Sequence, residues 1–169
     1  MSSNLQKTIK NEILLEGVGL HTGLKVKLVI KPSEVNSGIL FKRTDVDNEK
    51  SIIEANYKNV DAPILCTRIK NSYGVSVSTI EHLMAAFYIC GVDNLIVNID
   101  GPEVPIMDGS AKDFVKMIQN CGLKSLDKKR KFLKVVKKVN LKETVRSISI
   151  EPTENNFSVD FTLNYENPL

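Results

Sequence analysis

The sequence lacks the features that mark secreted, disulfide-rich or membrane-spanning proteins. None of its apolar runs approaches the roughly 18 residues of a membrane-spanning helix, and its first residues hold no apolar stretch of signal-peptide length. Its cysteines, Cys66, Cys90 and Cys121, are odd in number and form no CxxC motif, which argues against a disulfide framework and a cysteine zinc site. The sequence therefore predicts a protein of the reducing cytoplasm with no integral membrane segment.

The chain also lacks a strong charge of either sign. Its 169 residues are 42% apolar and 25% charged, with a net charge of +3, which is too small to imply a nucleic-acid partner. The basic cluster at 124–131 has no interleaved aromatic residues for stacking on bases, so a solvated connection is favoured over a nucleic-acid site. A chain of this length suits one domain, or one domain plus part of another.

Histidine is scarce, and one of the two histidines lies in the most informative stretch, residues 75–92. Ser78 is a candidate helix N-cap, Glu81 stands at the capping-box position, and Gly91 is a candidate stop. Four apolar residues at helical spacing predict one buried face: Ile80, Leu83, Met84 and Phe87.

His82 is predicted on the opposite face of this helix, at about 3.6 residues per turn. Its neighbours there, Ala85, Ala86 and Ile89, are also apolar, so both faces are expected to be buried. Two interpretations of the Glu81–His82 pair stay open from these residues alone. In the first, Glu81 is a capping acid and His82 is a hydrogen-bonded histidine; in the second, His82 binds a metal and Glu81 is a general base.

The rest of the N-terminal part alternates strand signals with glycine-rich or proline-rich loops. Apolar runs or period-two patterns predict strands at 8–15, 24–31, 38–43, 51–55, 65–69, 75–77 and 94–99. The loop from Asp100 to Gly109 carries Glu103 and Asp108, which are expected to shape it. A second helix is expected after it, with Ser110 as N-cap, Asp113 at the capping-box position and Gly122 as its stop.

Composition changes sharply after this helix. We predict an N-terminal α+β domain over 1–123, a basic linker at 124–131, and the start of a second domain at 132–169. Strands are expected at 132–139, 145–150 and 157–163, and no helix follows to cover them. Because a single sheet layer is not independently stable, the second domain is expected to be incomplete.

Four segments, in this order and spacing, resemble one family: GVGLHTG (17–23), LCT (65–67), STIEHLMAA (78–86) and PEVPIMDGSAKDFV (102–115). The family is the zinc-dependent UDP-3-O-acyl-N-acetylglucosamine deacetylase of Gram-negative bacteria, which performs the committed step of lipid A synthesis. The resemblance runs from about Thr8 to the end of the chain. It implies two similar α+β domains, each a two-layer sandwich of a mostly antiparallel sheet on two helices, with the active site between them.

The resemblance also implies roles for individual residues. His82 matches a zinc ligand, Glu81 the general base, and His21 a histidine near the nucleotide diphosphate of the UDP-sugar acyl substrate. The strand edge beside the substrate is matched by Leu65, Cys66 and Thr67. The acid–aromatic pair that holds the uracil is matched by Asp160 and Phe161. Strand alternation equally predicts Phe161 as a core residue. Cys66 is expected to be a pocket-wall thiol, since no histidine partner lies near it in sequence.

One departure from the family is large: no histidine follows His82. The family's remaining zinc ligands come from an H-x-x-x-D motif in the second domain, and a catalytic zinc site needs three protein ligands plus an open position. The chain alone is therefore expected to have little or no activity, with a second domain or chain completing the site. The alternative is a non-catalytic half-domain that pairs with a partner chain, as in a split enzyme.

Overall fold

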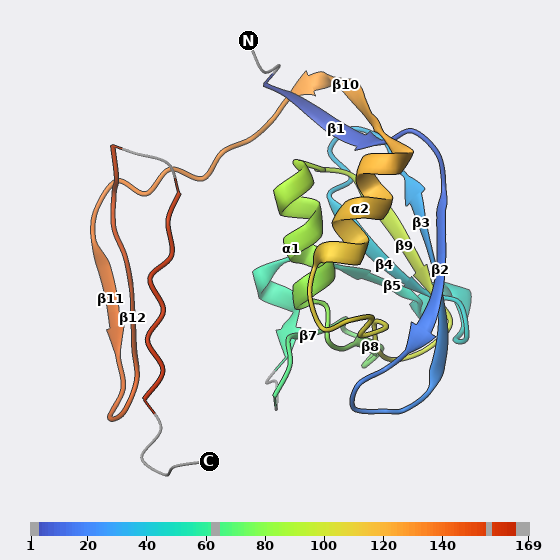
Figure 1. Ribbon diagram of the computed structural model, residues 1–169, viewed down its shortest axis with the longest axis horizontal. Coiled ribbons are helices and arrows are strands. Elements are labelled where there is room, and N and C mark those ends of the chain that lie inside the picture. The colour runs from blue at the N-terminus through green and yellow to red at the C-terminus, as the bar shows by residue number, and fades with distance from the viewer. Residues whose placement is uncertain (1–3, 62–64, 155–156, 165–169) are drawn as a thin grey trace. The chain divides into compact units, whose positions relative to one another are not determined.

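The computed structural model describes residues 4–61, 65–154 and 157–164 (Figure 1). It divides the chain into two compact units, Met1–Arg130 (unit 1) and Lys131–Leu169 (unit 2), and each unit is considered by itself below. Neither helix among the described residues has the length and apolar character needed to cross a bilayer.

Unit 1 is built on a five-stranded sheet with the order β2-β3-β9-β4-β5. Its strands are β2 (Ile13–Val18), β3 (Lys25–Pro32), β4 (Ile39–Arg43), β5 (Ile52–Glu54) and β9 (Leu95–Ile99). Neighbouring strands are antiparallel except for β4 and β9, which are parallel. Alternate residues of β3 are buried, as the pattern of its sequence predicts: Val26, Leu28 and Ile30.

Two smaller sheets flank the main one. Strand β1 (Leu5–Ile9) pairs antiparallel with β10 (Leu123–Lys129). A three-stranded antiparallel sheet consists of β6 (Val60–Asp61), β7 (Arg68–Lys70) and β8 (Ser76–Val77). Two single-turn helices, Asn48–Lys50 and Tyr57–Asn59, lie in the connections around β5.

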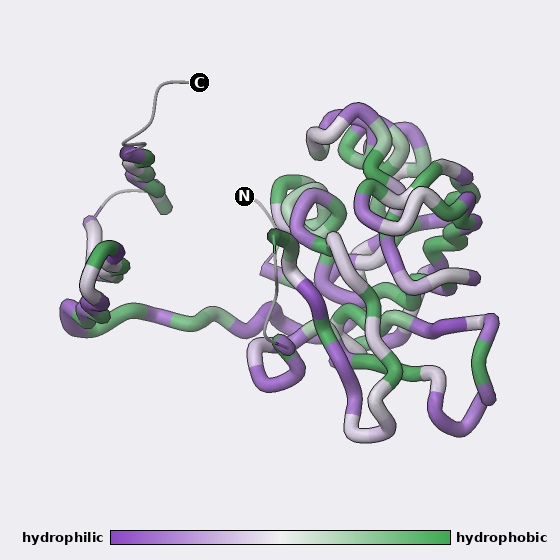
Figure 2. Tube along the Cα trace, turned by 90° about the horizontal axis from the view of Figure 1, so that it is seen from below, coloured by the Kyte–Doolittle hydropathy of each residue, from purple (hydrophilic) through white to green (hydrophobic). Residues whose placement is uncertain are grey.

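Two helices, α1 (Glu81–Cys90) and α2 (Lys112–Cys121), lie side by side on one face of the main sheet (Figure 1). The hydropathy trace shows hydrophobic and hydrophilic stretches alternating along the chain of unit 1 (Figure 2). The largest fully buried side chains include residues from both layers: Phe41, Phe87, Phe114, Leu28, Leu83 and Leu95. The predicted α+β sandwich of a mostly antiparallel sheet on two helices is therefore confirmed.

Helix α1 differs from its prediction at its start and on its outer face. It begins at Glu81, and no side chain caps it; Ser78 instead bridges to Glu103 in the loop before α2. The capping-box prediction is therefore wrong, because the backbone of Ser78 is used in pairing with another segment. Ile89 is 63% exposed, so the predicted burial of both helix faces is also wrong there. Gly91 ends the helix in the left-handed conformation, with φ of 69°, as predicted.

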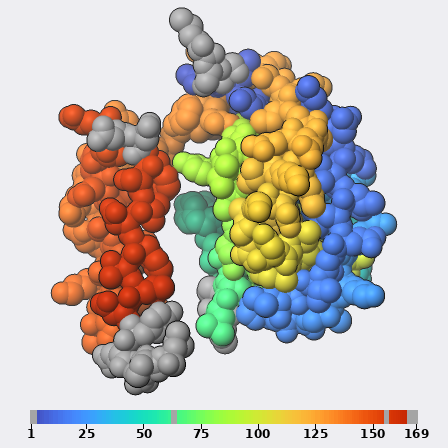
Figure 3. Space-filling model, viewed as in Figure 1, coloured from blue at the N-terminus to red at the C-terminus, as the bar shows by residue number. Residues whose placement is uncertain are grey.

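Helix α2 ends at Gly122, as predicted, but its N-cap lies one position after the predicted cap, Ser110. Its N-cap is Ala111, which makes no side-chain bond. Ser110 still accepts a hydrogen bond from the Lys112 backbone N–H at 3.1 Å, and its hydroxyl donates to Asp108 Oδ1 at 2.8 Å. The space-filling view shows α2 and the preceding loop, in yellow to orange, at the surface of unit 1 (Figure 3).

The predicted basic linker is wrong over 124–129, which belong to strand β10, and the single predicted strand at 8–15 is divided into β1 and β2. Lysine-rich sequence forms a strand here because β1 offers an unpaired edge.

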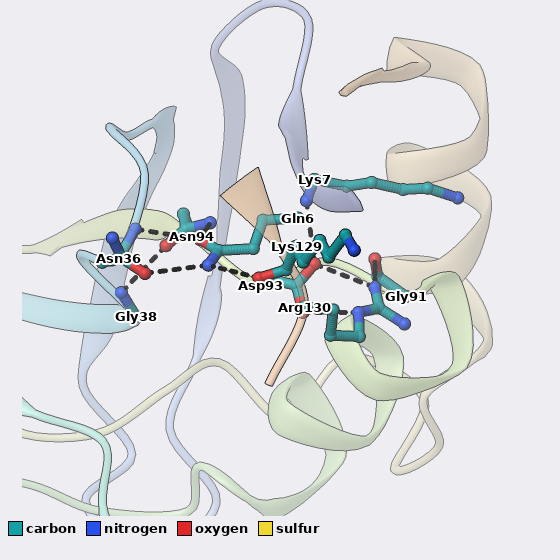
Figure 4. Close-up of polar contacts among 9 residues, drawn as sticks. All are labelled: Gln6, Lys7, Asn36, Gly38, Gly91, Asp93, Asn94, Lys129 and Arg130. Atoms are coloured by element: carbon teal, nitrogen blue, oxygen red, sulfur yellow. Dashed lines mark hydrogen bonds and ion pairs between the residues drawn. The ribbon is translucent and has the colours of Figure 1, made fainter. Parts of the chain in front are cut away.

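A polar cluster then holds the end of β10 (Figure 4). The Arg130 guanidinium donates to Asp93 Oδ2 at 2.9 Å and to the Gly91 carbonyl, while Asp93 Oδ2 also accepts from the Lys7 backbone N–H at 2.8 Å.

Among the described residues of unit 2, the regular secondary structure is a hairpin of two antiparallel strands, β11 (Val139–Lys142) and β12 (Ser147–Ile150). The predicted strands at 132–139 and 157–163 are wrong except at Val139, and Phe161 is 79% exposed rather than core. An alternating pattern becomes a strand only where another strand pairs with it. Residues 155–156 and 165–169 of the predicted second domain lie outside the described residues.

Candidate functional site

The start of α1 brings Glu81 and His82 next to the loop before α2. The chain reaches the helix through Ser78, whose backbone N–H donates to the Pro102 carbonyl at 2.9 Å and whose carbonyl accepts from Val104 at 3.0 Å. Thr79 then adopts a left-handed conformation with φ of 58°, which is uncommon for a β-branched residue. This turn places the helix start against the residue 102–105 segment.

Glu81 is exposed and is oriented by Thr67 of the predicted substrate edge. Its Oε2 accepts a hydrogen bond from the Thr67 backbone N–H at 3.0 Å. The Thr67 carbonyl in turn accepts from the Ile80 N–H at 3.3 Å. These two bonds join the 65–67 segment to the helix start, so the structure brings Glu81 and Thr67 together.

His82 is buried, with 8% of its surface exposed, and its ring packs against Phe114 of α2 at a centroid distance of 5.3 Å. Its Nε2 lies 3.1 Å from the Pro105 carbonyl oxygen. Because a carbonyl can only accept, this bond requires a proton on Nε2, which leaves the lone pair of a neutral ring on Nδ1. A backbone carbonyl on one ring nitrogen is the usual support for a histidine that binds metal through the other.

The ligand set as a whole does not make a zinc site. Over residues 4–61, 65–154 and 157–164, no three histidine, cysteine, aspartate or glutamate side chains gather where they could hold a metal ion. His82 therefore fits a single zinc ligand, and the described residues alone do not fit the zinc that the resemblance implies.

His21 lies in the turn between β2 and β3, where its backbone is held by Glu103. Its N–H lies 3.0 Å from Oε1 of Glu103, and the Thr22 N–H and hydroxyl donate to Oε2 at 2.9 and 2.8 Å. Burial alone raises the pKa of the Glu103 carboxyl, but the hydrogen bonds from His21, Thr22 and Thr79 outweigh it and lower the pKa to about 2. Glu103 is therefore an ionised, fully buried acid.

The other two residues of the predicted substrate edge differ in exposure. Leu65 has φ of 61° and is 88% exposed, while Cys66 is a half-buried free thiol. A hollow of about 210 Å³ adjoins this edge and is mainly apolar. It is lined by Ala55, Asn56, Tyr57, Val60, Thr67, Ile69, Ile80, Glu81 and Met84.

Asp160 and Phe161 belong to unit 2 and are exposed there, in a described segment without regular structure. Within unit 1, the structure brings together Glu81, Thr67 and His82. In the loop before α2 of unit 1, hydrogen bonds from Ser110 lower the pKa of the Asp108 carboxyl.

Sequence reasoning missed the roles of Thr79 and of the Pro105 carbonyl, and it assigned Glu103 only a part in shaping its own loop. The signal for Glu103 was present: it is an acid between apolar residues in a proline-rich loop, where a buried carboxylate needs several donors. The partners of that carboxylate lie 24 and 82 positions away, so no local pattern identifies them.

Comparison with known proteins adds a match along nearly the whole chain. The sequence model of the family described as UDP-3-O-acyl N-acetylglycosamine deacetylase matches residues 6–169. Relatives named UDP-3-O-acyl-N-acetylglucosamine deacetylase are 44% identical in Geotalea uraniireducens, 39% in Aliivibrio fischeri and 40% in Blochmanniella pennsylvanica. These matches cover 97%, 96% and 96% of this chain, but 52%, 53% and 54% of the relatives.

Proposed function

The chain belongs to the UDP-3-O-acyl N-acetylglycosamine deacetylase family, and on this basis we propose that a protein containing it hydrolyses the N-acetyl amide of UDP-3-O-acyl-N-acetylglucosamine. That reaction is the committed step of lipid A synthesis. The chain spans about half the length of the curated relatives it matches, so the activity is proposed for the complete site. The observation that carries the proposal is the pairing of an oriented carboxylate, Glu81, with a buried imidazole, His82, at the start of α1.

We assign Glu81 the role of general base. Its exposed carboxylate is reachable by water, and the Thr67 N–H fixes its orientation from the side of the substrate edge. In amide hydrolysis such a carboxylate accepts a proton from the attacking water as the new C–O bond forms. A positioned base of this kind contributes about 10²- to 10⁴-fold to the rate.

His82 is proposed as one zinc ligand, through Nδ1, because the Pro105 carbonyl occupies Nε2. The zinc itself is proposed only for a site whose further ligands come from beyond the described residues. A second domain or a partner chain would supply them.

The remaining predicted residues are proposed as substrate contacts. His21 is assigned to the nucleotide diphosphate, the 65–67 edge to the sugar side of the substrate, and Asp160 with Phe161 to the uracil. Three free thiols suit a reducing compartment, and we propose the cytoplasm.

The experiment is an assay of acetate release from UDP-3-O-acyl-N-acetylglucosamine by three proteins. These are the 169-residue chain, the chain fused to the C-terminal half of the Geotalea uraniireducens relative, and that intact relative as positive control. We expect no turnover by the chain alone, turnover by the fusion, and a 10²- to 10⁴-fold lower kcat in the fusion with Glu81→Gln.

Glu49→Gln is the matched control, since Glu49 is an exposed glutamate of the same unit outside the site. It should leave kcat unchanged. A folded, zinc-loaded fusion without activity would contradict the proposed reaction. Robust turnover by the 169-residue chain would show instead that this chain holds a complete site.

A further inference from the structure

The carboxylate of Glu103 is the point at which two separate parts of the candidate site meet. Glu103 is fully buried, and it accepts hydrogen bonds from the backbone N–H groups of His21 and Thr22 and from the hydroxyls of Thr22 and Thr79. No cation pairs with it among the residues that the structure describes. Its charge is therefore balanced by N–H and O–H donors from two distant segments.

The first of these segments, the β2–β3 turn, is folded tightly around the carboxylate. A Cβ added at Gly19 would lie 2.4 Å from Glu103 Oε2, closer than any side chain can approach. Only glycine therefore allows the turn to bring the His21 and Thr22 amides onto the acid.

The second segment is the entry to α1. The Thr79 hydroxyl donates to Glu103 Oε1 at 2.8 Å, while its backbone has φ of 58°. Such a conformation is strained in a non-glycine residue and persists only where the surroundings impose it. Here the bond to Glu103 and the pairing of Ser78 with residues 102–104 impose it.

We propose that Glu103 is a positioning residue that fixes the turn carrying His21 and the helix start carrying Glu81 and His82 in one relative arrangement. The same loop contributes the Pro105 carbonyl that orients the His82 ring. The significance of Glu103 for catalysis rests on the proposed function, whereas its effect on the positions of His21 and His82 does not.

The competing explanation is that Glu103 only stabilises the fold. The two explanations differ in what happens in molecules that remain folded. A purely stabilising residue leaves the folded state unchanged when it is altered, whereas loss of a positioning residue shifts the groups it holds.

The test uses the imidazole NMR signals of the chain, which has only two histidines. Spectra of the 169-residue protein are recorded well below its melting temperature, with His21→Gln identifying each signal. Glu103→Gln should move or broaden both signals, because the amide NH2 of glutamine is itself a donor and would face N–H and O–H groups that now donate to the carboxylate. The control Glu49→Gln should move neither signal.

A milder pair of variants keeps the test decisive if Glu103→Gln does not fold. Thr79→Ala removes one donor and should shift the His21 signal, 58 positions away in sequence (79 minus 21), while Thr79→Ser should restore it. An unchanged His21 signal in folded Thr79→Ala would overturn the proposal.

Kinetics separate this proposal from the proposed function. In the fusion protein, Glu103→Gln should lower kcat roughly 10- to 100-fold, and the loss should persist at temperatures where the variant is fully folded. An unmodified fusion without deacetylase activity would refute the proposed function but leave the NMR result standing. Normal kcat in Glu103→Gln, together with unshifted histidine signals, would refute the positioning role.

Discussion

At the scale of single residues, the unusual feature of unit 1 is a buried negative charge, Glu103, with no positive partner among the residues that the structure describes. Burying a carboxylate is costly unless hydrogen bonds replace its hydration, and Glu103 receives them from His21, Thr22 and Thr79. These donors favour the ionised form, and they lower the pKa of Glu103 to about 2 although burial opposes this. The stability of unit 1 is therefore coupled to pH.

The sign of this coupling follows from the lowered pKa. In the unfolded chain Glu103 takes up a proton near its ordinary pKa of 4.5, whereas in the folded chain it does so only near 2. Its contribution to the free energy of unfolding is thus complete above about pH 4.5 and is lost as the pH falls towards 2. We expect a loss of roughly 3 kcal/mol from this group over that window.

Urea unfolding between pH 5 and 2 measures this effect. Other carboxyls with lowered pKa, such as Asp45 beside Arg43, also contribute, so Glu103→Gln is measured in parallel. The difference in stability between the two proteins should shrink as the pH falls. A difference that stays constant with pH would contradict the assignment of a low pKa to Glu103.

At the scale of elements, strand β10 shows how a basic sequence is recruited into the fold. Its partner β1 supplies the strand edge, and Arg130 at its end bonds to Asp93, just beyond the end of α1. The Arg130 and Asp93 side chains are 28% and 21% exposed, and the guanidinium Nε lies 2.8 Å from Asp93 Oδ1. Partly buried ion pairs of this kind contribute more than exposed ones.

A double-mutant cycle of Arg130→Gln and Asp93→Asn tests this link. We expect each single change to lower the free energy of unfolding by about 1–2 kcal/mol, with a coupling energy of about 1 kcal/mol. The matched control is Lys31→Gln, which breaks the more exposed pair with Glu12 and should change stability by less than about 0.5 kcal/mol. Purely additive effects at positions 93 and 130 would show that the ion pair does not hold β10.

At the scale of the whole molecule, the hydrophobic core belongs to unit 1. Every buried apolar side chain of the described residues lies between Ile9 and Ile118, and the hairpin of unit 2 is exposed along both strands. Because burial of apolar surface is the main source of stability, unit 1 should fold without unit 2.

Removal of 131–169 should therefore leave the melting temperature within about 2 °C of that of the full chain, measured by circular dichroism. Removal of 123–169, which also takes β10 and Arg130, is the contrasting truncation and should lower it clearly. A melting temperature unchanged in both truncations would show that β10 adds nothing to the fold. A clear fall already on removal of 131–169 would show that unit 2 stabilises unit 1.

The elements of unit 1 were largely predictable because their patterns are local. Alternation fixes which side of β3 is buried, and the helical spacing of Leu83 and Phe87 fixes the inner face of α1. The start of α1 was not predictable, since the backbone of Ser78 pairs with residues 102–104 instead of capping the helix. Strand β10 was missed because its stability comes from a partner more than 100 positions earlier.

The sequence by itself determined the fold class and the family, and it singled out Glu81 and His82 as candidate site residues, because these depend on short motifs and on periodicities of a few residues. The tertiary structure alone decided how those residues are held. Thr67 orients Glu81, Pro105 orients His82, and Glu103 joins the His21 turn to the entry of α1. The physical reason is that a buried carboxylate or imidazole takes its hydrogen-bond partners from whatever segments pack against it, and packing brings together residues that sequence order keeps far apart.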